Sequence, residues 1–318
     1  MSDYFLISVA TAQHLRLCLR HRVAGFSNSI NGLWAYLDIE VGDYVTFLHG
    51  ARLYNLYQVY AKVAHEHADT LGPWEPITWR SKRTYYFPFR LYLQPVRTFV
   101  EPLVRPEFAF VGDHLFLRGG YRKTHFQSDQ AMLSWALQAG RPAQEPRPSI
   151  PRTPTFEPKI VLRRHEAVPP YRYHLQENIL QALLRRKIRA HLSEIQRAFN
   201  MAGSPQAYEI LGETALAEGF VDLLLKPLAK GKAKNWVLIE VKAGRVTRRD
   251  FEQLARYLRQ VPDAAGGMLI GRAFPRQISP WADKPLLAWR YDFTLPATRG
   301  TGYTFDAMRR ALRLTRVR

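Results

Sequence analysis

The stretch Trp236-Val-Leu-Ile-Glu240-Val-Lys242 decides the fold of the second half of this chain. Its apolar run predicts a buried central strand, because strands covered on both faces read as continuous hydrophobic sequence. Side chains alternate between the two faces of a strand, so Glu240 and Lys242 project from the same side. Charged groups at the end of a buried strand are costly to desolvate unless they serve a purpose. The stretch therefore predicts a strand with a charged site at its end.

A second strand is expected just upstream, in Gly219-Phe-Val-Asp222-Leu-Leu-Leu-Lys226. If the two strands pair as a hairpin, the Asp222 carboxylate reaches the side of the sheet that carries Glu240. Two carboxylates can hold Mg²⁺ through their oxygens, and such a metal lowers the pKa of a bound water and offsets charge on a phosphate. Lys242 would orient that water or stabilise the developing charge. The alternative is a solvated strand end, because two acids and a lysine at this spacing form a loose pattern.

The flanking sequence predicts an α/β order around these strands. Apolar residues recur at helical spacing from 175 to 199, which indicates one long amphipathic helix with a basic polar face. Thr247 and Asp250 can form a variant capping box at the start of a second helix. The expected elements are a helix at 175–199, strands at 208–211, 220–226 and 236–242, a helix at 247–260 and a strand at 267–271.

Three more side chains are candidates for the same site. Glu177 lies in the first turn of the first helix, where its carboxylate can turn inward as a third acid near the metal. Gln253 and Tyr257 are four residues apart and therefore share one helical face. They could brace the site or touch the scissile backbone.

Together these residues resemble the PD-(D/E)xK nuclease superfamily, and the Gln-x-x-x-Tyr helix resembles its RecB-like branch and the archaeal mismatch endonucleases. The matching motifs are Glu177, Gly219-Phe-Val-Asp222-Leu-Leu, Ile239-Glu-Val-Lys242 and Gln253-x-x-x-Tyr257. The resemblance covers residues 171–272 and implies a restriction-endonuclease-like mixed sheet flanked by helices. It implies Asp222 and Glu240 as ligands of Mg²⁺, for which Mn²⁺ can substitute, Lys242 as the catalytic lysine and Glu177 as an auxiliary acid. Val221 departs from the pattern, in which proline is common at this position.

The composition favours a polyanionic partner. The 318 residues include 46 Lys and Arg against 27 Asp and Glu, a net charge of +19 that is spread along the chain. This balance favours nucleic acid over a membrane surface, and the nuclease resemblance implies that the nucleic acid is double-stranded DNA. No apolar run of about 18 residues occurs and the first residues lack a basic signal-peptide region, so a cytoplasmic location is expected. Cys18 is the only cysteine, so any metal must be held by oxygen or histidine.

Proline marks the expected boundary between two globular domains. Residues 141–170 are rich in proline, which favours an extended, semi-rigid linker between a domain at 1–140 and another at 171–318. In the first domain, short strands are expected at 4–9, 44–48, 56–63 and 89–96, with helices at 11–20 and 128–139. A small β-barrel or strongly curved sheet with flanking helices fits this pattern, which makes the whole chain α+β and α/β.

Aromatic side chains beside polar ones indicate a base-binding pocket in the first domain. Trp34 and Trp79 could sandwich a base taken out of the helix, while Ser29 or Asn31 hydrogen-bonds its edge. The alternative is that the tryptophans fill a barrel core. Residues 26–34, 42–47 and 86–96 resemble EVE and YTH domains of the PUA-like group. Such domains bind a modified base in an aromatic cage, and the resemblance adds Trp74 as a third cage candidate.

Three further features specify no reaction. His65-Glu-His67-Ala-Asp69 could bind a metal or be a solvated loop. Residues 118–123 read as a phosphate-contacting turn or a plain surface loop. The arginines among the last ten residues give a basic face that can add non-specific affinity for a nucleic-acid backbone.

The two resemblances together imply a modification-dependent, type IV-like restriction endonuclease. It would flip a modified, methylated base into the aromatic cage and hydrolyse the DNA backbone with Mg²⁺. Because one site cuts one strand, a homodimer is expected for double-strand cleavage. The alternatives are a mismatch- or structure-specific repair nuclease and a non-catalytic RNA- or DNA-binding protein. Cages for N6-methyladenine and 5-methylcytosine use similar aromatics, so either base fits.

Overall fold

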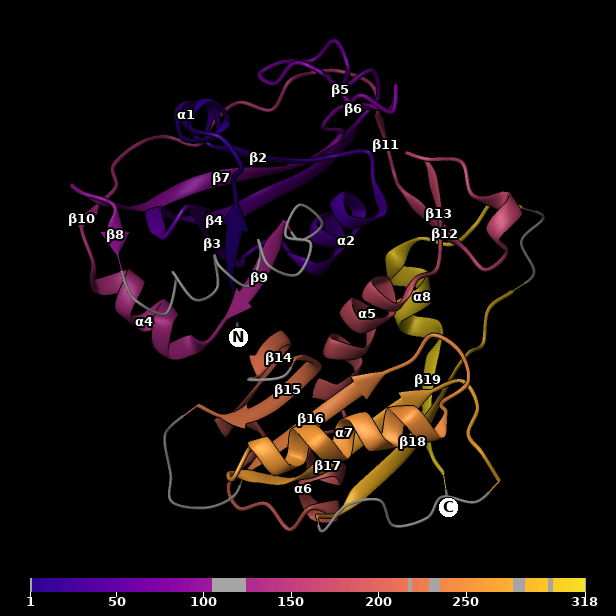
Figure 1. Ribbon diagram of the computed structural model, residues 1–318. Coiled ribbons are helices and arrows are strands. Elements are labelled where there is room, and N and C mark those ends of the chain that lie inside the picture. Colours follow the sequence, from indigo (N-terminus) through magenta and orange to yellow (C-terminus); the bar gives the residue numbers. More distant parts are fainter. Residues whose placement is uncertain are drawn as a thin grey trace. The chain divides into compact units, whose positions relative to one another are not determined.

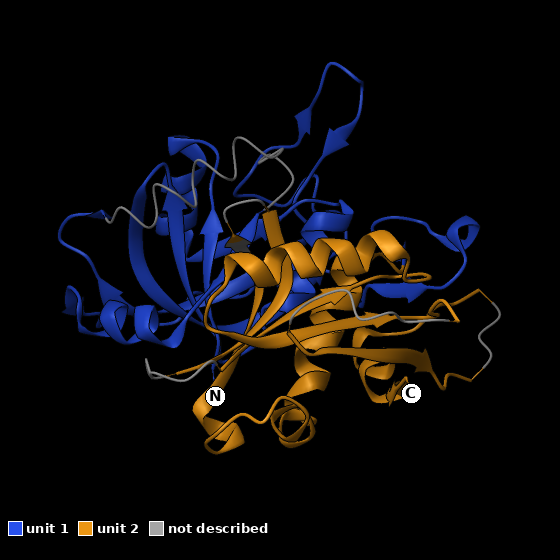
Figure 2. Cartoon of the chain, turned by 60° about the horizontal axis from the view of Figure 1, so that its bottom comes forward, with its two compact units in different colours: residues 1–174 blue, residues 175–318 orange. Residues whose placement is uncertain are grey.

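The computed structural model describes residues 2–104, 124–216, 219–228, 235–276, 284–296 and 300–317. The chain divides into two compact units, Met1–His174 and Leu175–Arg318, which Figure 2 colours separately. In the part of the chain that the structure describes there are seven α-helices and several sheets, so the expected mixture of helix and sheet is confirmed. Within the same residues, no helix is both long enough and apolar enough to cross a membrane.

Unit 1 is built on a mixed sheet whose main path runs β10, β7, β4, β3, β1, β9 (Figure 1). These strands are β1 Tyr4–Ser8, β3 Tyr44–His49, β4 Arg52–His65, β7 Phe89–Thr98, β9 His125–Ser128 and β10 Arg141–Pro142. Three more strands join it, namely β2 Val23–Phe26 on β7, and β8 Leu103–Val104 and β11 Thr155–Phe156 on β4. β1 is parallel to β3, whereas β4 is antiparallel to both of its main neighbours. The four strands that the sequence predicts are all present.

The described strands of unit 1 do not close into a barrel, which is one of the two forms that the sequence predicts, the other being a strongly curved sheet. Among the described strands, β10 and β9 are the two ends of the main path and do not pair with each other. β10 is only two residues long and ends at Pro142, whose nitrogen cannot donate a hydrogen bond to a further strand. Closure of a sheet depends on pairing between distant segments, which local sequence patterns do not encode.

Three helices accompany this sheet. They are α1 Ala12–His21, α2 Ile30–Asp38 and α4 Gln130–Gln138. The side chains of Thr11, Ser29 and Asp129 cap them by accepting a backbone hydrogen bond from the first turn. The sequence predicts α1 and α4 but misses α2, in which every residue from Gly32 to Asp38 is buried. A helix buried on all sides lacks the polar face by which an amphipathic helix is recognised.

The proline-rich stretch lies along unit 1 instead of forming a free spacer. β10 pairs with β7 and β11 pairs with β4. Between them, the carbonyl oxygens of Pro146 and Pro148 accept hydrogen bonds from Arg22 and from the Tyr60 hydroxyl. β12 Lys159–Val161 and β13 Arg172–His174 then form a separate two-stranded sheet. The stretch is extended, as its proline content predicts, but unit 1 holds it over much of its length.

Unit 2 contains a six-stranded mixed sheet in the order β14 to β19. The strands are β14 Tyr208–Leu216, β15 Gly219–Pro227, β16 Trp236–Val241, β17 Ala264–Gly271, β18 Leu286–Phe293 and β19 Leu312–Arg316. β14, β15 and β16 are antiparallel, β16, β17 and β18 are parallel, and β19 returns antiparallel to β18. The hairpin and central strand predicted around Asp222 and Glu240 are thus β15 and β16.

Helices cover both faces of this sheet. They are α5 Glu177–Arg189, α6 Leu192–Ala198, α7 Arg248–Gln260 and α8 Phe305–Ala311. A Cβ on Gly266 of β17 would meet Phe199, which follows α6, whereas a Cβ on the next residue, Gly267, would meet Leu254 of α7. Neighbouring strand residues face opposite sides, so α6 and α7 lie on opposite faces. In Figure 1, α7 runs across the strands of unit 2.

Two expectations about these helices have different outcomes. The capping box at the start of α7 is present, with Thr247 and Asp250 hydrogen-bonded to each other's backbone. The single long helix expected at 175–199 is wrong, because α5 ends at Arg189 and α6 begins at Leu192. The break lies at Ala190 and His191, where the His191 backbone (φ −111°, ψ 8°) leaves helical geometry while apolar spacing continues on both sides.

Candidate active site

Strand pairing places Asp222 of β15 beside Glu240 of β16. Leu223 pairs with Ile239, so the residues before and after them are cross-strand neighbours. Asp222 Oδ2 accepts a hydrogen bond of 2.7 Å from the Val241 N–H, and Oδ1 accepts one of 2.7 Å from Gln181 Nε2 of α5. Burial, and then the Glu240 carboxylate beside it, raise the pKa of Asp222 well above its usual range. The carboxylate is therefore fixed from two sides and electrostatically strained.

Glu240 is the most deeply buried acid of the site, with 1% of its surface exposed. Its Oε2 accepts hydrogen bonds of 3.3 Å from both Lys242 Nζ and Gln253 Nε2. Its Oε1 is buried and has no hydrogen-bond partner. Burial raises the pKa of Glu240. A buried polar atom without a partner costs about 1–3 kcal/mol, so this oxygen calls for an explanation.

Lys242 and Glu177 complete the charged group. Lys242 Nζ lies 3.3 Å from Glu240 Oε2 and 3.7 Å from Glu177 Oε1. Burial alone would lower the pKa of the Lys242 ammonium, but the carboxylates of Asp222, Glu240 and Glu177 outweigh it and raise that pKa. In this arrangement Lys242 donates a hydrogen bond to Glu240. Glu177 Oε2 accepts a hydrogen bond of 3.1 Å from the Ala243 N–H, at the start of α5 where the helix dipole favours an anion.

Gln253 and Tyr257 connect α7 to the acids. Gln253 Nε2 donates to Glu240 Oε2 at 3.3 Å and to the Tyr257 hydroxyl at 3.2 Å. Tyr257 in turn packs over the start of β15, because a Cβ on Gly219 would lie 2.3 Å from its hydroxyl oxygen. The structure thus brings together all six residues that the sequence proposes for this site.

Two further residues that the sequence analysis missed support the site. Gln181 is 6% exposed and donates to Asp222. Its only sequence signal is its position one helical turn after Glu177, which puts both on the same face of α5. The Tyr291 hydroxyl of β18 donates to the carbonyl of Ala243, the residue whose N–H donates to Glu177. Nothing in the sequence around Tyr291 indicates this contact.

The oxygen atoms of this group fit a hard divalent cation. Asp222 and Glu240 present adjacent carboxylates that repel each other, and one of their buried oxygens is unpaired. No cluster of three or more His, Cys, Asp and Glu side chains in metal-binding geometry occurs among the described residues. Mg²⁺ does not need one, since it keeps several waters and is bound through one or two carboxylates.

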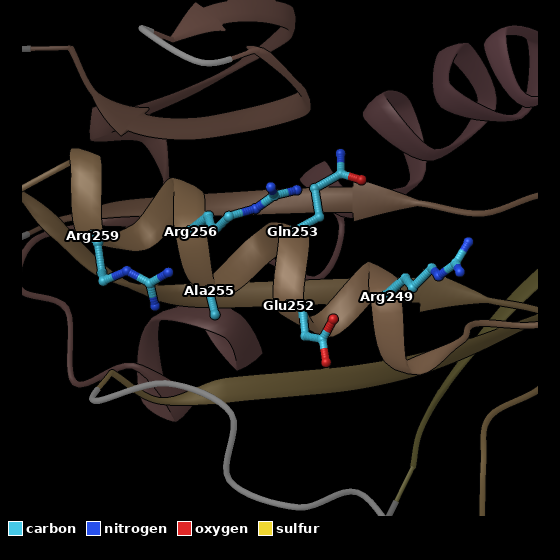
Figure 3. A pocket seen from close by; sticks show the side chains of 6 residues that line it. All are labelled: Arg249, Glu252, Gln253, Ala255, Arg256 and Arg259. Carbon is cyan, nitrogen blue, oxygen red and sulfur yellow. The ribbon is translucent and has the colours of Figure 1, made fainter.

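An arginine-lined hollow lies next to Gln253 on α7 (Figure 3). Its volume is about 580 Å³, and its lining includes Arg249, Arg256 and Arg259. In Figure 3 the Arg256 and Gln253 side chains lie on the same side of the helix. A cationic surface next to the acids offers contacts for phosphates on either side of a scissile bond.

The tryptophans proposed as a base cage do not meet in unit 1. Trp34 is 6% exposed on α2, with its ring edge-to-face 4.5 Å from His125. Trp74 is 5% exposed and packs against Phe87. Trp79 is 56% exposed between the short strands β5 Ile77–Thr78 and β6 Thr84–Tyr85. In the described part of the chain no ring contact joins these tryptophans. Trp34 lies in the core because it belongs to α2, a helix that the sequence does not predict, whereas Trp79 lies at the surface.

The polar cage candidates have local roles. Ser29 accepts a hydrogen bond of 3.1 Å from the Gly32 N–H as the N-cap of α2, and its hydroxyl lies 2.8 Å from that of Ser27. Asn31 is half-buried in the first turn of the same helix. Both residues therefore belong to the start of α2.

The remaining sequence features are placed as follows. His65 is 1% exposed, and its two ring nitrogens lie 2.8 Å from the Thr153 and Tyr92 hydroxyls, so it is not free to bind a metal with His67. Residues 118–123 and Arg318 lie outside the described residues. In the basic C-terminal segment, Arg309 pairs with Asp306 at 3.1 Å.

Comparison with known proteins adds no assignment. No protein-family model and no curated protein sequence matches this chain. The function must therefore be argued from the site itself.

Proposed function

We propose that this chain is a metal-dependent DNA endonuclease whose cutting site lies at the end of β16. One observation carries the proposal, namely the buried Glu240 Oε1 that has no hydrogen-bond partner and stands beside the half-buried Asp222 carboxylate. Burying two like charges is unfavourable unless a cation offsets them. The residues assigned to the site are Glu177, Asp222, Glu240, Lys242, Gln253 and Tyr257.

The architecture around the acids supports the same proposal. An antiparallel hairpin leads into a parallel pair of strands, with helices on both faces. This agrees with the restriction-endonuclease-like fold that the PD-(D/E)xK resemblance implies. Gln253 of α7 donates to both Tyr257 and Glu240, the proposed metal ligand, which gives the helix motif a physical role.

In this proposal Asp222 and Glu240 hold Mg²⁺, or Mn²⁺ in its place. The metal, when bound, supplies Lewis acidity to the phosphate and lowers the pKa of a water. Gln181 and the Val241 N–H fix the Asp222 carboxylate, while Gln253 fixes that of Glu240. Lys242, which donates to Glu240, would also donate to the oxygen on which charge develops. Glu177 holds the Lys242 ammonium in place and anchors the turn after β16.

The proposed substrate is double-stranded DNA that carries a modified base. The net charge of +19 and the arginine-lined hollow on α7 support a nucleic-acid backbone as the ligand of this surface. The resemblance of residues 3–135 to EVE and YTH domains supports selection of a modified base by unit 1. The described residues of each chain contain one such site, so we propose that two copies act together to cut both strands.

Digestion of a DNA panel tests this function. The panel contains one duplex sequence that is unmodified, N6-methylated at adenine, 5-methylated at cytosine or mismatched, each incubated with Mg²⁺ and with EDTA. We expect cleavage of one modified duplex with Mg²⁺, none with EDTA and none by Asp222→Ala, which should still bind DNA. Cleavage of the mismatched duplex alone would favour a repair nuclease, and full activity of Asp222→Ala would overturn the assignment.

A further inference from the structure

A second hollow lies in unit 1, away from the tryptophans that the sequence proposes as a cage. It has a volume of about 210 Å³, and its lining includes Glu66, Asp69, Tyr86, Phe156, Pro170 and Tyr171. We propose that this hollow receives a single flipped nucleobase that carries an exocyclic amino group. The inference rests on the proposed function only in taking DNA as the partner.

Aromatic rings form the walls of the hollow. The Phe156 and Tyr171 rings lie 4.8 Å apart at 61°, so they present two differently oriented surfaces. Tyr171 is 44% exposed, which is unusual for a large ring and leaves one face open. Base stacking on aromatic rings is a general source of affinity for unpaired bases, because every base has a π-face.

Carboxylates supply the polar side. Glu66 and Asp69 line the hollow together with the rings. Asp69 and the Tyr86 ring line the same hollow. Burial raises the pKa of Tyr86, and the Asp69 carboxylate adds to this increase, whereas the hydrogen bond with Asn28 opposes it. A carboxylate accepts hydrogen bonds from the amino group of cytosine or adenine but repels phosphate. The hollow therefore favours a base edge over the backbone.

The segments that form the hollow are held rigidly. The buried Arg90 guanidinium donates to the carbonyls of Leu71, Gly72 and Phe87, which fixes the loop after β4. On the other side, β11 pairs with β4, and the Glu66 N–H donates to the Pro154 carbonyl at 3.0 Å. A site held by its surroundings loses little conformational entropy when it binds.

The size of the hollow limits the ligand. Pockets for drug-sized ligands have volumes of about 300–1,000 Å³, and this one is smaller. It suits one planar ring system and not a peptide or a whole nucleotide. A methylated ammonium ion also binds between aromatic rings, but the net charge of +19 favours nucleic acid as the partner.

Equilibrium binding of the full chain to short duplexes in EDTA tests the proposal. The target base stands opposite an abasic site, which removes the cost of unpairing it. Targets are adenine, N6-methyladenine, cytosine, 5-methylcytosine and, as the base without an exocyclic amino group, thymine. We expect at least one amino-bearing base to bind about tenfold more tightly than thymine.

Two variants and a control locate the binding site. Tyr171→Ala, and Glu66→Ala combined with Asp69→Ala, should each remove the preference without lowering the melting temperature, because these side chains lie at the surface. Trp79→Ala removes a more exposed ring and should keep the preference. The proposal would be overturned if the wild type shows no preference, if the preference survives in both variants, or if Trp79→Ala loses it. It would also be overturned if tetramethylammonium competes with the duplex for binding and the free base does not.

This experiment separates the pocket from the nuclease. Binding is measured without Mg²⁺, so a chain that shows the preference but never cuts would overturn the nuclease and leave the pocket. A chain that cuts DNA with Mg²⁺ but binds all targets equally would overturn the pocket and leave the nuclease.

Discussion

Replacing Glu240 by glutamine should stabilise the metal-free protein. The substitution keeps the shape of the side chain, removes a buried negative charge that repels the half-buried Asp222 carboxylate, and replaces the carboxylate with an amide. The Glu240 Oε1 atom has no hydrogen-bond partner, and the penalty for such a buried group is about 1–3 kcal/mol. For a domain of roughly 150 residues, each kcal/mol changes the melting temperature by about 2–4 °C. Glu240→Gln should therefore melt several degrees higher than the wild type in EDTA.

Mg²⁺ should reverse this order. A cation present at a hundred times its dissociation constant stabilises the wild type by about 2.7 kcal/mol. Glu240→Gln loses a metal ligand and should gain much less. The assay is thermal unfolding of both chains in EDTA and in Mg²⁺, with hydrogen exchange of the β15 and β16 peptides to show that the change is local.

Glu209→Gln is the matched control. Glu209 of β14 is 7% exposed and pairs with Lys226 at 3.5 Å in the same sheet. Removing one partner of a buried ion pair destabilises a protein, so this variant should melt lower in both solutions. Glu240→Gln also removes an ion-pair partner of Lys242, but Lys242 keeps the Glu177 carboxylate at 3.7 Å and Asp222 is relieved of a like charge. The reasoning fails if Glu240→Gln melts at or below the wild type in EDTA, or if Mg²⁺ stabilises both equally.

Three further predictions follow from single contacts. Gly219→Ala places a Cβ 2.3 Å from the Tyr257 hydroxyl, so it should lower the free energy of unfolding by about 1–3 kcal/mol and slow cleavage. Adding Tyr257→Phe should restore part of the stability, and cleavage by Gly219→Ala at the wild-type rate would contradict this. Burial, and then the charge of Arg90, lower the pKa of His65 to about 4 in the folded chain, against about 6.5 in the unfolded chain. Up to ~3 kcal/mol of the free energy of unfolding is therefore present above pH 6.5 and should be lost as the pH falls toward 4. Melting curves against pH check this, and a pH-independent melting temperature would exclude it. Arg256→Ala in the α7 hollow should reduce the salt dependence of DNA binding by about one phosphate contact, and an unchanged slope would remove this arginine from the interface.

The sequence predicts the central part of unit 2 well because its signals are local. The Val-Leu-Ile run produces β16, and Thr247 with Asp250 produces the start of α7. The alternation of side chains along β16 explains why Glu240 and Lys242 meet on one side. Charged residues within an apolar run are a strong signal, since their cost demands a purpose.

The sequence fails where the outcome depends on distant segments. α2 is buried on all sides, so no pattern separates it from a strand or a loop, and the place of Trp34 in the core could not be predicted without it. Gln181 contacts Asp222 across 41 residues, and a glutamine on a helix gives no sign of such a contact. The hollow in unit 1 joins residues from the end of β4 to Tyr171, which come together only in the folded chain.

The most direct test of the account is the single-turnover cleavage rate of Lys242→Ala in Mg²⁺. Lys284→Ala is the control, because this half-buried lysine of unit 2 donates to the Val261 carbonyl beyond the end of α7. We predict that Lys242→Ala cuts modified DNA about 10²–10³-fold more slowly than the wild type, as expected for loss of a donor to developing charge. Lys284→Ala should cut at the wild-type rate. Equal rates for the wild type and Lys242→Ala would contradict the assignment of this site as the nuclease centre.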